Sequence, residues 1–189
     1  MNDEYLRLDV KCQLEERFLR LTYSIENRGG HDVYLLNRFF VTTPQLAIEA
    51  NRALVIFDMI SYENIVRVEK CAPTLPKGRT VYRPYVPLVS PVRAGKKYQD
   101  VISIAVPIEE WQPPGYGQVP RLEKPRLRTF GGIVFRIDYY WSAAGVQERS
   151  QTIGNDQVVT PVFPPGIIPT TQTLRSGLIR LNIRVLDRR

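Results

Sequence analysis

The sequence predicts an all-β protein built as an antiparallel two-sheet sandwich. Three observations predict this class. Several segments alternate apolar and polar residues with a period of two, as half-buried strands do. Prolines gather between these segments, and no stretch has the period of a convincing amphipathic helix. The chain has 189 residues, and we expect a single domain over 1–189, because all-β folds often exceed the usual length of one domain.

Two strands open the chain. Apolar residues occupy even positions from Leu6 to Leu14 and odd positions from Leu19 to Ile25. The change of phase between Glu15 and Phe18 predicts a tight turn that joins the two strands. We expect the apolar face of each strand to lie in the core and the charged face to lie in water.

The next strands are separated by polar turns. A cluster of residues that tolerate positive φ, at 27–32, predicts a turn. Residues 37–52 are ambiguous, because Pro44 to Arg52 fits either a short helix or an irregular crossover between sheets. The strands expected on either side of this segment are 33–36, 53–57 and 65–70.

Three proline-rich stretches divide the second half of the chain. Residues 72–97 carry a proline density that argues against a central strand, because proline cannot donate to the ladder. Residues 109–129 and 154–174 are predicted to be two further loops. Between them we expect a central strand at 133–141, turned at 143–145 into a partner at 146–153. The remaining predicted strands are 98–108 and 178–186, which brings the total to about nine.

Short strands at this spacing, with proline-rich crossings and no β-α-β rhythm, resemble an immunoglobulin-like sandwich. The resemblance is one of architecture. Cys12 and Cys71 are expected to be buried free thiols, with a disulfide between them as the alternative. The N-terminus lacks the pattern of a secretory leader and no apolar run reaches the ~20 residues of a membrane helix, so we expect a cytoplasmic protein that does not bind membranes.

The net charge of +7 is unevenly distributed. The first 70 residues carry 9 cationic and 11 acidic side chains, whereas the remainder carries 17 and 8. The basic half is therefore a candidate surface for an acidic partner. Cations interleaved with tyrosines are typical of single-strand nucleic-acid binders. The candidate polyanion-binding residues are Lys77, Arg79, Arg83, Arg93, Lys96 and Lys97 in one loop and Arg121, Lys124, Arg126 and Arg128 in the next.

The composition offers little catalytic chemistry. His31 is the only histidine, and its place in a Gly-Gly turn favours a solvated loop residue over a base or ligand. Cys12, His31 and Cys71 match no zinc spacing, so we expect no metal and no cofactor. Paired carboxylates remain, because a glycosidase needs only two of them across a cleft. Glu109, Glu110 and Asp138 lie near Trp111 and Tyr140 in the sequence and make a carboxylate-dependent glycosidase or sugar-binding domain an alternative hypothesis.

The second distinctive segment is aromatic and rich in proline. Its residues Trp111, Pro113, Pro114 and Tyr116 lie in a long loop, and Trp and Tyr carry much of the energy at protein interfaces. The main hypothesis is therefore a non-catalytic interaction module. It presents its proline-rich loops to a protein partner or, through an open sheet edge, to a second copy of itself.

Overall fold

A computed structural model describes residues 4–42, 48–51, 55–60, 63–73, 86–109, 125–153 and 156–187. These residues are almost all β-strand and include no α-helix, which confirms the predicted all-β class. They form fourteen strands, not the nine expected. In chain order the strands are β1 (Leu6–Leu14), β2 (Phe18–Asn27), β3 (Val33–Thr42), β4 (Ile48–Asn51), β5 (Ile56–Ile60), β6 (Ile65–Lys70), β7 (Leu88–Val92), β8 (Lys97–Ala105), β9 (Ile108–Glu109), β10 (Arg126–Trp141), β11 (Gln147–Ile153), β12 (Asp156–Val162), β13 (Gln172–Arg175) and β14 (Ile179–Asp187).

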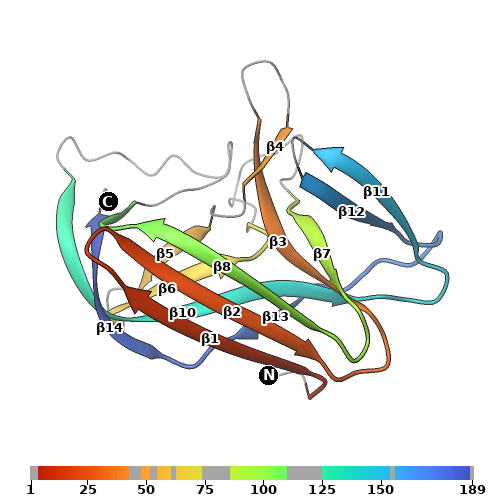
Figure 1. Cartoon of the computed structure of the whole chain (residues 1–189), viewed down its shortest axis with the longest axis horizontal. Helices are drawn as coiled ribbons and strands as arrows, with labels where there is room; N and C mark the ends of the chain where they lie inside the picture. The colour runs from red at the N-terminus through yellow and green to blue at the C-terminus, as the bar shows by residue number, and fades with distance from the viewer. Residues whose placement is uncertain are drawn as a thin grey trace.

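One layer is a three-stranded antiparallel sheet in the order β1-β2-β8 (Figure 1). Strands β1 and β2 are the predicted hairpin, since Leu14 lies opposite Leu19 and the amide of Glu15 donates to the carbonyl of Phe18 at 2.8 Å. The apolar face of β2 is fully buried, as expected, whereas Leu14 is 45% exposed. The prediction of a buried face is therefore wrong at the far end of β1, because β1 is the terminal strand of this sheet.

The other layer is a larger sheet with β10 near its centre. Strand β10 pairs antiparallel with β3, β13 and β14 and parallel with β6. This confirms the predicted central strand at 133–141, although β10 begins at Arg126, inside the segment predicted to be irregular. Strands β9 and β14 also run parallel. The prediction of a purely antiparallel sandwich is wrong in this sheet, because partners that are distant in sequence are not constrained by a hairpin turn.

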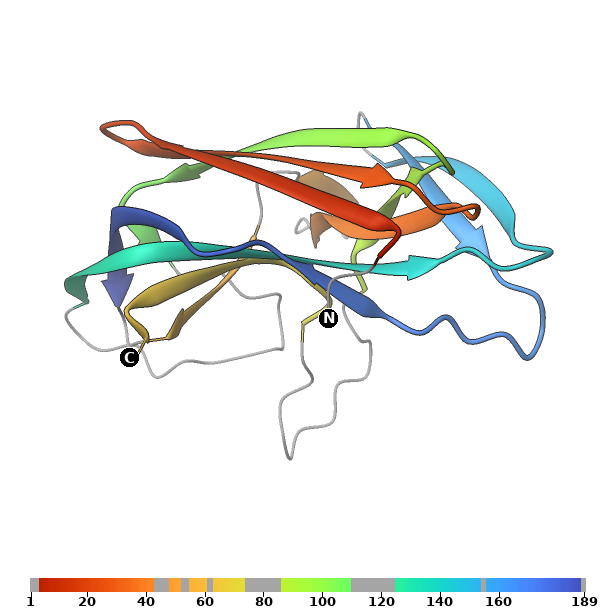
Figure 2. The ribbon, with the colours of Figure 1, turned by 90° about the horizontal axis from the view of Figure 1, so that it is seen from below.

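The two layers pack face to face around one apolar interior (Figure 2). Leu21, Tyr23 and Ile25 of β2 are fully buried, as are Phe135 and Ile137 of β10. The rings of Tyr23 and Phe135 join the layers, with centroids 4.9 Å apart. Burial of this apolar surface is the main force that holds the sandwich together.

Strand β8 and the strand after it belong to different sheets. We expected a continuous strand at 98–108, but β8 ends at Ala105 and β9 begins at Ile108 beside β14. Pro107 lies between them and has no N–H to donate to a ladder. The chain therefore crosses from one layer to the other at this proline.

The proline-rich stretches contain strands that the sequence analysis missed. Strand β7 lies between β3 and β12, so the argument against a central strand in this stretch is wrong. Pro91 of β7 lies opposite Tyr34 of β3, whereas the pairing with β12 is at Val89. Proline is excluded from a strand only at positions where a backbone N–H must donate to a neighbouring strand. In β7, Pro91 lies two residues away from Val89, where β7 pairs with β12. Strand β12 similarly lies within the predicted loop 154–174, and β13 begins inside it and ends at Arg175.

Two predicted connections also differ from the structure. The turn at 143–145 connects β10 to β11, but these two strands do not form the expected hairpin. Strand β11 pairs with β12 and not with β10. Residues 48–51 form β4, which pairs with β3, and the alternative of a helix there is wrong. Residues 48–51 alternate with a period of two, whereas 147–152 are all polar, and in neither case does the local sequence identify the partner strand.

Candidate functional site

Three turns meet where β2, β7 and β10 end, at residues 28–32, 93–96 and 142–146. We call this region the turn end (Figure 1). Asp32 joins the three turns. Its Oδ1 accepts a hydrogen bond from the amide of Ala94 at 2.9 Å, and its carbonyl accepts one from the amide of Ser142 at 2.8 Å. The turns therefore hold a fixed position relative to one another.

Asn27 fixes the conformation of the first turn from inside. Its side chain is fully buried, and its Nδ2 donates to the carbonyls of His31 at 2.8 Å and Val92 at 3.0 Å. Its Oδ1 accepts from the amide of Gly29 at 3.0 Å. One amide side chain thus bonds to three backbone groups of the turn end.

Arg93 links two acidic side chains at the surface of the turn end. Its NH1 lies 2.7 Å from Asp32, and its guanidinium also pairs with Glu148, which accepts a further bond from the hydroxyl of Tyr34 at 2.8 Å. The hydrogen bonds from Arg93 hold the pKa of Glu148 below its ordinary value. Partial burial acts to raise the pKa of Asp32, but Arg93 and the amide of Ala94 outweigh it and the pKa is lowered. Both carboxylates are therefore ionised and paired at neutral pH.

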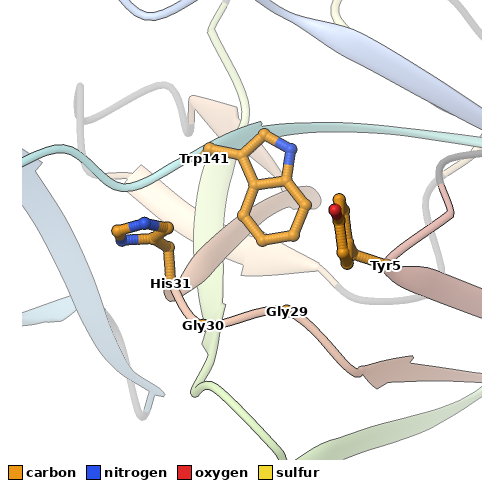
Figure 3. Close-up of a pocket in the computed structure, with 5 residues that line it drawn as sticks. All are labelled: Tyr5, Gly29, Gly30, His31 and Trp141. Carbon is orange, nitrogen blue, oxygen red and sulfur yellow. The ribbon is translucent and has the colours of Figure 1, made fainter.

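An aromatic pocket of about 460 Å³ opens at the turn end (Figure 3). In this view the indole of Trp141 stands between His31 and Tyr5, with the backbone of the two glycines beneath it. Tyr5 is 55% exposed. The residues that line the pocket are Tyr5, Gly29, Gly30, His31 and Trp141.

The two glycines have different roles in the pocket. A Cβ at Gly29 would lie 3.1 Å from Cη2 of Trp141, so the indole lies close against the turn and any larger residue at position 29 would have to displace it slightly. A Cβ at Gly30 would have no heavy atom within 4 Å, so position 30 faces open space. The amide of Arg28 donates to the carbonyl of Tyr5 at 2.7 Å and ties the start of β1 to the turn. The pocket is thus assembled from three distant segments that backbone contacts hold together.

Among the residues that the structure describes, no Asp, Glu, Lys or Arg side chain lines this pocket. Two acidic residues near the turn have cationic partners, since Glu26 pairs with Arg28 at 2.8 Å and Asp32 pairs with Arg93. A third, Glu4, is exposed and directly precedes Tyr5 in the chain. The described lining is therefore made of aromatic rings, an imidazole and glycine backbone. The sequence analysis singled out His31 only as a solvated loop residue and Trp141 only as a strand residue, because nothing in a one-dimensional pattern brings positions 5, 31 and 141 together.

The predicted protein-binding residues Trp111, Pro113, Pro114 and Tyr116 lie outside the described residues. The third predicted loop is described in part and carries an exposed apolar tip at residues 164–169. Ile168 is 88% exposed and Ile167 is 41% exposed. The tip is braced, because the ring of Phe163 packs edge-on against Tyr140 with centroids 5.5 Å apart and the amide of Ile167 donates to the carbonyl of Pro164 at 3.1 Å.

The predicted polyanion-binding residues divide between the two ends of the sandwich. Lys77, Arg79, Arg83, Arg121 and Lys124 lie outside the described residues. Arg93, Lys96 and Lys97 lie at the turn end, and Arg126 and Arg128 lie at the start of β10. Figure 1 shows β10 running along the whole molecule, and its 16 residues span on the order of 50 Å. The described members of the two basic clusters therefore form no continuous surface, and Arg128 also pairs with Asp187 at 3.0 Å.

The predicted carboxylate pair is likewise separated. Asp138 is 7% exposed and accepts hydrogen bonds from the amide of Ala72 at 3.0 Å and the hydroxyl of Thr173 at 2.6 Å. Glu109 lies beside the end of β14, at the opposite end of β10, a separation on the order of 30 Å. These two carboxylates do not flank one bond, and Glu110 and Trp111 lie outside the described residues.

A second polar cluster lies in the interior between the layers. The Nδ2 of Asn37 donates to the hydroxyls of Tyr98 at 2.8 Å and Tyr23 at 3.1 Å, and both hydroxyls lie near Asp100 at 3.3–3.4 Å. Lys70 is fully buried, with its Nζ 5.0 Å from the ring centroid of Phe39. Burial lowers the pKa of Lys70 to about 7, against an opposing effect from Asp100. Asn37, Tyr23 and Lys70 are buried, and Tyr98 and Asp100 are half-buried. We treat this cluster as structural, because its polar groups bond to one another across the two layers.

Both cysteines are free thiols, as expected, but of the two only Cys71 is buried, and Cys12 is partly exposed because β1 is the terminal strand of its sheet. Burial raises the pKa of Cys12 to about 11 and raises that of Cys71 further, with the carboxylates of Asp138 and Glu69 adding to the effect. Neither is a thiolate nucleophile at neutral pH. Within the described ranges, no three His, Cys, Asp or Glu side chains are placed to hold a metal ion.

The geometry defines a class of protein, an all-β sandwich with a preorganised aromatic pocket at one end. No protein-family model, no curated protein and no solved structure matches the chain. Among the residues that the structure describes, none belongs to a helix with the length and apolar character needed to span a bilayer.

Proposed function

We propose that this protein is a non-catalytic interaction module that binds a polypeptide, either a protein partner or a second copy of itself, through the turn end. The observation that carries the proposal is the aromatic pocket held on turns that Asn27 and Asp32 fix in place. Exposed aromatic side chains on loops that a rigid scaffold positions are typical of recognition sites. An immunoglobulin-like use of the sandwich, with recognition by loops at one end, is part of this proposal.

The exposed isoleucines of the third loop support the same surface. A Cβ at Gly145, in the turn after β10, would lie 3.1 Å from the side chain of Pro164, so the loop carrying Ile168 packs against the turn end. The side chain of Ile168 at this tip is 88% exposed and adds nothing to the core. Burial of this side chain against a partner would lower the free energy. The loop segment with Trp111 and Tyr116 belongs to the same proposal on its composition.

Polyanion binding through the basic loops is a weaker proposal. Arg93 and Arg128 already pair with carboxylates, so an anion would have to compete with Asp32 and Asp187. A protein that tracked phosphates with these cations would lose affinity steeply as salt rises. Retention of single-stranded RNA on a filter at low salt, and its loss at high salt, would revive this alternative.

The test of the main proposal is capture of a partner with matched variants. We expect the wild-type protein, immobilised, to retain a defined set of proteins from an extract of its native host. The double variant Tyr5→Ala with His31→Ala should lose that set, because both side chains line the pocket. The control Lys11→Ala with Gln13→Ala alters exposed positions of β1 and should retain it. Identical capture by all three proteins would contradict the proposal.

A further inference from the structure

Strand β1 forms an edge of the three-stranded sheet (Figure 1). In the part of the chain that the structure describes, β1 pairs with β2 on one side and with no strand on the other. We propose that two copies of this chain associate by antiparallel pairing of their β1 strands, with Val10 of each copy on a two-fold axis. The two small sheets then form one continuous sheet. The surface is the edge of β1 and not the turn end, so this proposal goes beyond the proposed function.

The backbone of β1 directs alternate residues to this edge. The amide of Arg28 donates to the carbonyl of Tyr5 at 2.7 Å, before β1 begins. The amide of Glu15 donates to the carbonyl of Phe18 at 2.8 Å, after β1 ends. With the unbroken register between β1 and β2, these bonds place the hydrogen-bonded pairs at the odd-numbered residues of β1. The N–H and C=O groups of the even-numbered residues therefore point away from β2. These residues are Leu6, Leu8, Val10, Cys12 and Leu14.

A pairing centred on Val10 matches these groups over the whole strand. It brings even-numbered residues opposite even-numbered residues, so each outward N–H meets an outward C=O. Leu6 of one copy then lies opposite Leu14 of the other, and Leu8 lies opposite Cys12. All these side chains are apolar, and Leu14 is 45% exposed in the single chain. Pairing therefore covers apolar surface that one chain leaves in contact with water.

The charges of β1 favour this register over its neighbours. The outer face of the strand carries Arg7, Asp9 and Lys11, all exposed. With Val10 on the axis, Asp9 of each copy lies opposite Lys11 of the other, in non-hydrogen-bonded pairs where side chains are closest. An axis shifted by one residue, to Asp9 or to Lys11, would instead place like charges opposite each other. Axes further along the strand in either direction align only about half of it. The sequence of β1 is therefore complementary to itself in one full-length antiparallel register.

The opposite edge of the same sheet, β8, is protected from such pairing. The amide of Asn27 donates to the carbonyl of Lys96 at 2.9 Å, so the even-numbered residues of β8 bond to β2 and the amide of Val101 points to the edge. That amide donates to Oδ1 of Asp100 at 2.9 Å. A carboxylate on the inner face and an occupied donor both disfavour a further strand. Within Leu6–Leu14 no proline, register shift or inner-face charge gives β1 such protection.

Charge reversal tests the register. We expect the purified protein to sediment as a dimer, and Lys11→Asp to weaken dimerisation by about tenfold or more, because two pairs of like charge then face each other. Asp9→Lys should weaken it similarly. An equimolar mixture of the two variants should recover the dimer, because opposite charges then face each other in the mixed pair.

Controls separate this effect from a change in folding. Within one chain, Asp9 and Lys11 lie opposite the neutral residues Ser24 and Thr22, so both reversals should leave the midpoint of thermal unfolding near that of the wild type. Arg20→Asp, at an exposed position of β2, reverses a charge away from the edge and should leave the dimer intact.

A disulfide tests the position of the axis. Val10→Cys in a Cys12→Ser background places the two new thiols on one hydrogen-bonded pair, whose Cα atoms lie about 5.5 Å apart, within the range of a disulfide. We expect mild oxidation to give a covalent dimer. The wild type should give none, because the two Cys12 residues are roughly 14 Å apart along the pairing. Arg20→Cys in the Cys12→Ser background should also give none.

The outcomes separate this proposal from the proposed function. A protein that stays monomeric at the highest soluble concentration, a dimer that neither reversal weakens, or oxidation that does not link Val10→Cys would overturn the β1 pairing. A dimer that is lost in Tyr5→Ala with His31→Ala but kept in Lys11→Asp would also overturn it, because self-association would then use the turn end. Capture of other proteins from the extract should be the same for Lys11→Asp as for the wild type, so either proposal can fail without the other.

Discussion

Asn27 and Asn37 are both buried asparagines, but Asn27 bonds to backbone groups of turns and Asn37 bonds to side chains between the layers. Asn27 bonds to backbone groups of two segments of the turn end, and each polar group of its amide has a partner. Asn37 bonds to the hydroxyls of Tyr23 and Tyr98, and no partner for its Oδ1 is found in the part of the chain that the structure describes. The first residue fixes loops, whereas the second belongs to a polar cluster between the layers.

This comparison shows how burial determines the effect of a polar group on the free energy of folding. At the turn end, the buried polar atoms have hydrogen-bond partners and the ion pairs lie near water. These groups therefore fix the conformation of the turns with little loss of stability. In the interior, Lys70 is enclosed with a lowered pKa, so its ammonium form destabilises the fold. The turn end should therefore respond most to loss of a hydrogen-bonding side chain, and the interior to pH.

The largest expected effect is at Asn27. Replacing Asn27 by Ala removes the partners of the Gly29 amide and of the His31 and Val92 carbonyls. Each unsatisfied buried group costs about 1–3 kcal/mol, and some of these groups can reach water, so we expect a total loss of about 3 kcal/mol. Urea denaturation measures it.

Asn182→Ala, at an exposed position of β14, is the matched control and should change the free energy of unfolding by less than about 0.5 kcal/mol. A loss at Asn27 no larger than this control would show that the turn does not depend on its side chain. In that case the comparison between the two asparagines would fail.

The next largest expected effect comes from Lys70, whose lowered pKa should make the free energy of unfolding depend on pH above pH 7. Its pKa is lowered to about 7 in the folded protein, while the unfolded chain keeps the ordinary value near 10.4. Between these two values the unfolded state binds more protons, so the free energy of unfolding rises with pH. We expect a rise of about 2 kcal/mol from pH 7 to pH 9. Urea denaturation across this range measures it.

The variant Lys70→Met should abolish this rise, and Lys97→Met, at an exposed end of β8, should preserve it. Above about pH 10 the trend should reverse, because burial raises the pKa values of Tyr23 and Tyr98 in the folded protein. An unchanged slope in Lys70→Met would mean that this lysine is not the group that titrates.

The sequence predicted the parts of the fold that depend on local pattern. The period of two located β1, β2, β10 and β14, since alternation reflects one strand face in contact with a core. It missed β7, because the proline density of 72–97 was taken to exclude a central strand, whereas a proline is excluded only where its N–H would have to donate. The site depends on contacts between distant segments, with Tyr5 before β1, His31 after β2 and Trp141 at the end of β10. Each type of residue was visible, but their meeting point follows from strand order, which alternation does not encode.

Replacement of Arg93 should cause the smallest loss of stability, and it tests the ion pairs of the turn end, which lie near water. Its side chain is 49% exposed, and those of Asp32 and Glu148 are 30% and 23% exposed, so solvent screens both pairs. We expect Arg93→Met to cost about 1 kcal/mol or less at pH 7. The folded-state pKa values of both carboxyls are lowered, so the pairing contributes fully above their ordinary values and is lost as pH falls through the lowered ones. The difference between wild type and Arg93→Met should therefore shrink from pH 7 to pH 3 in urea denaturation, while Arg20→Met on the outer face of β2 shows no such trend. If the difference between wild type and Arg93→Met stays constant or grows at acid pH, Arg93 stabilises the turn end by packing of its aliphatic chain and not by charge. The comparison between the ion pairs of the turn end and the interior cluster around Lys70 would then have no electrostatic basis.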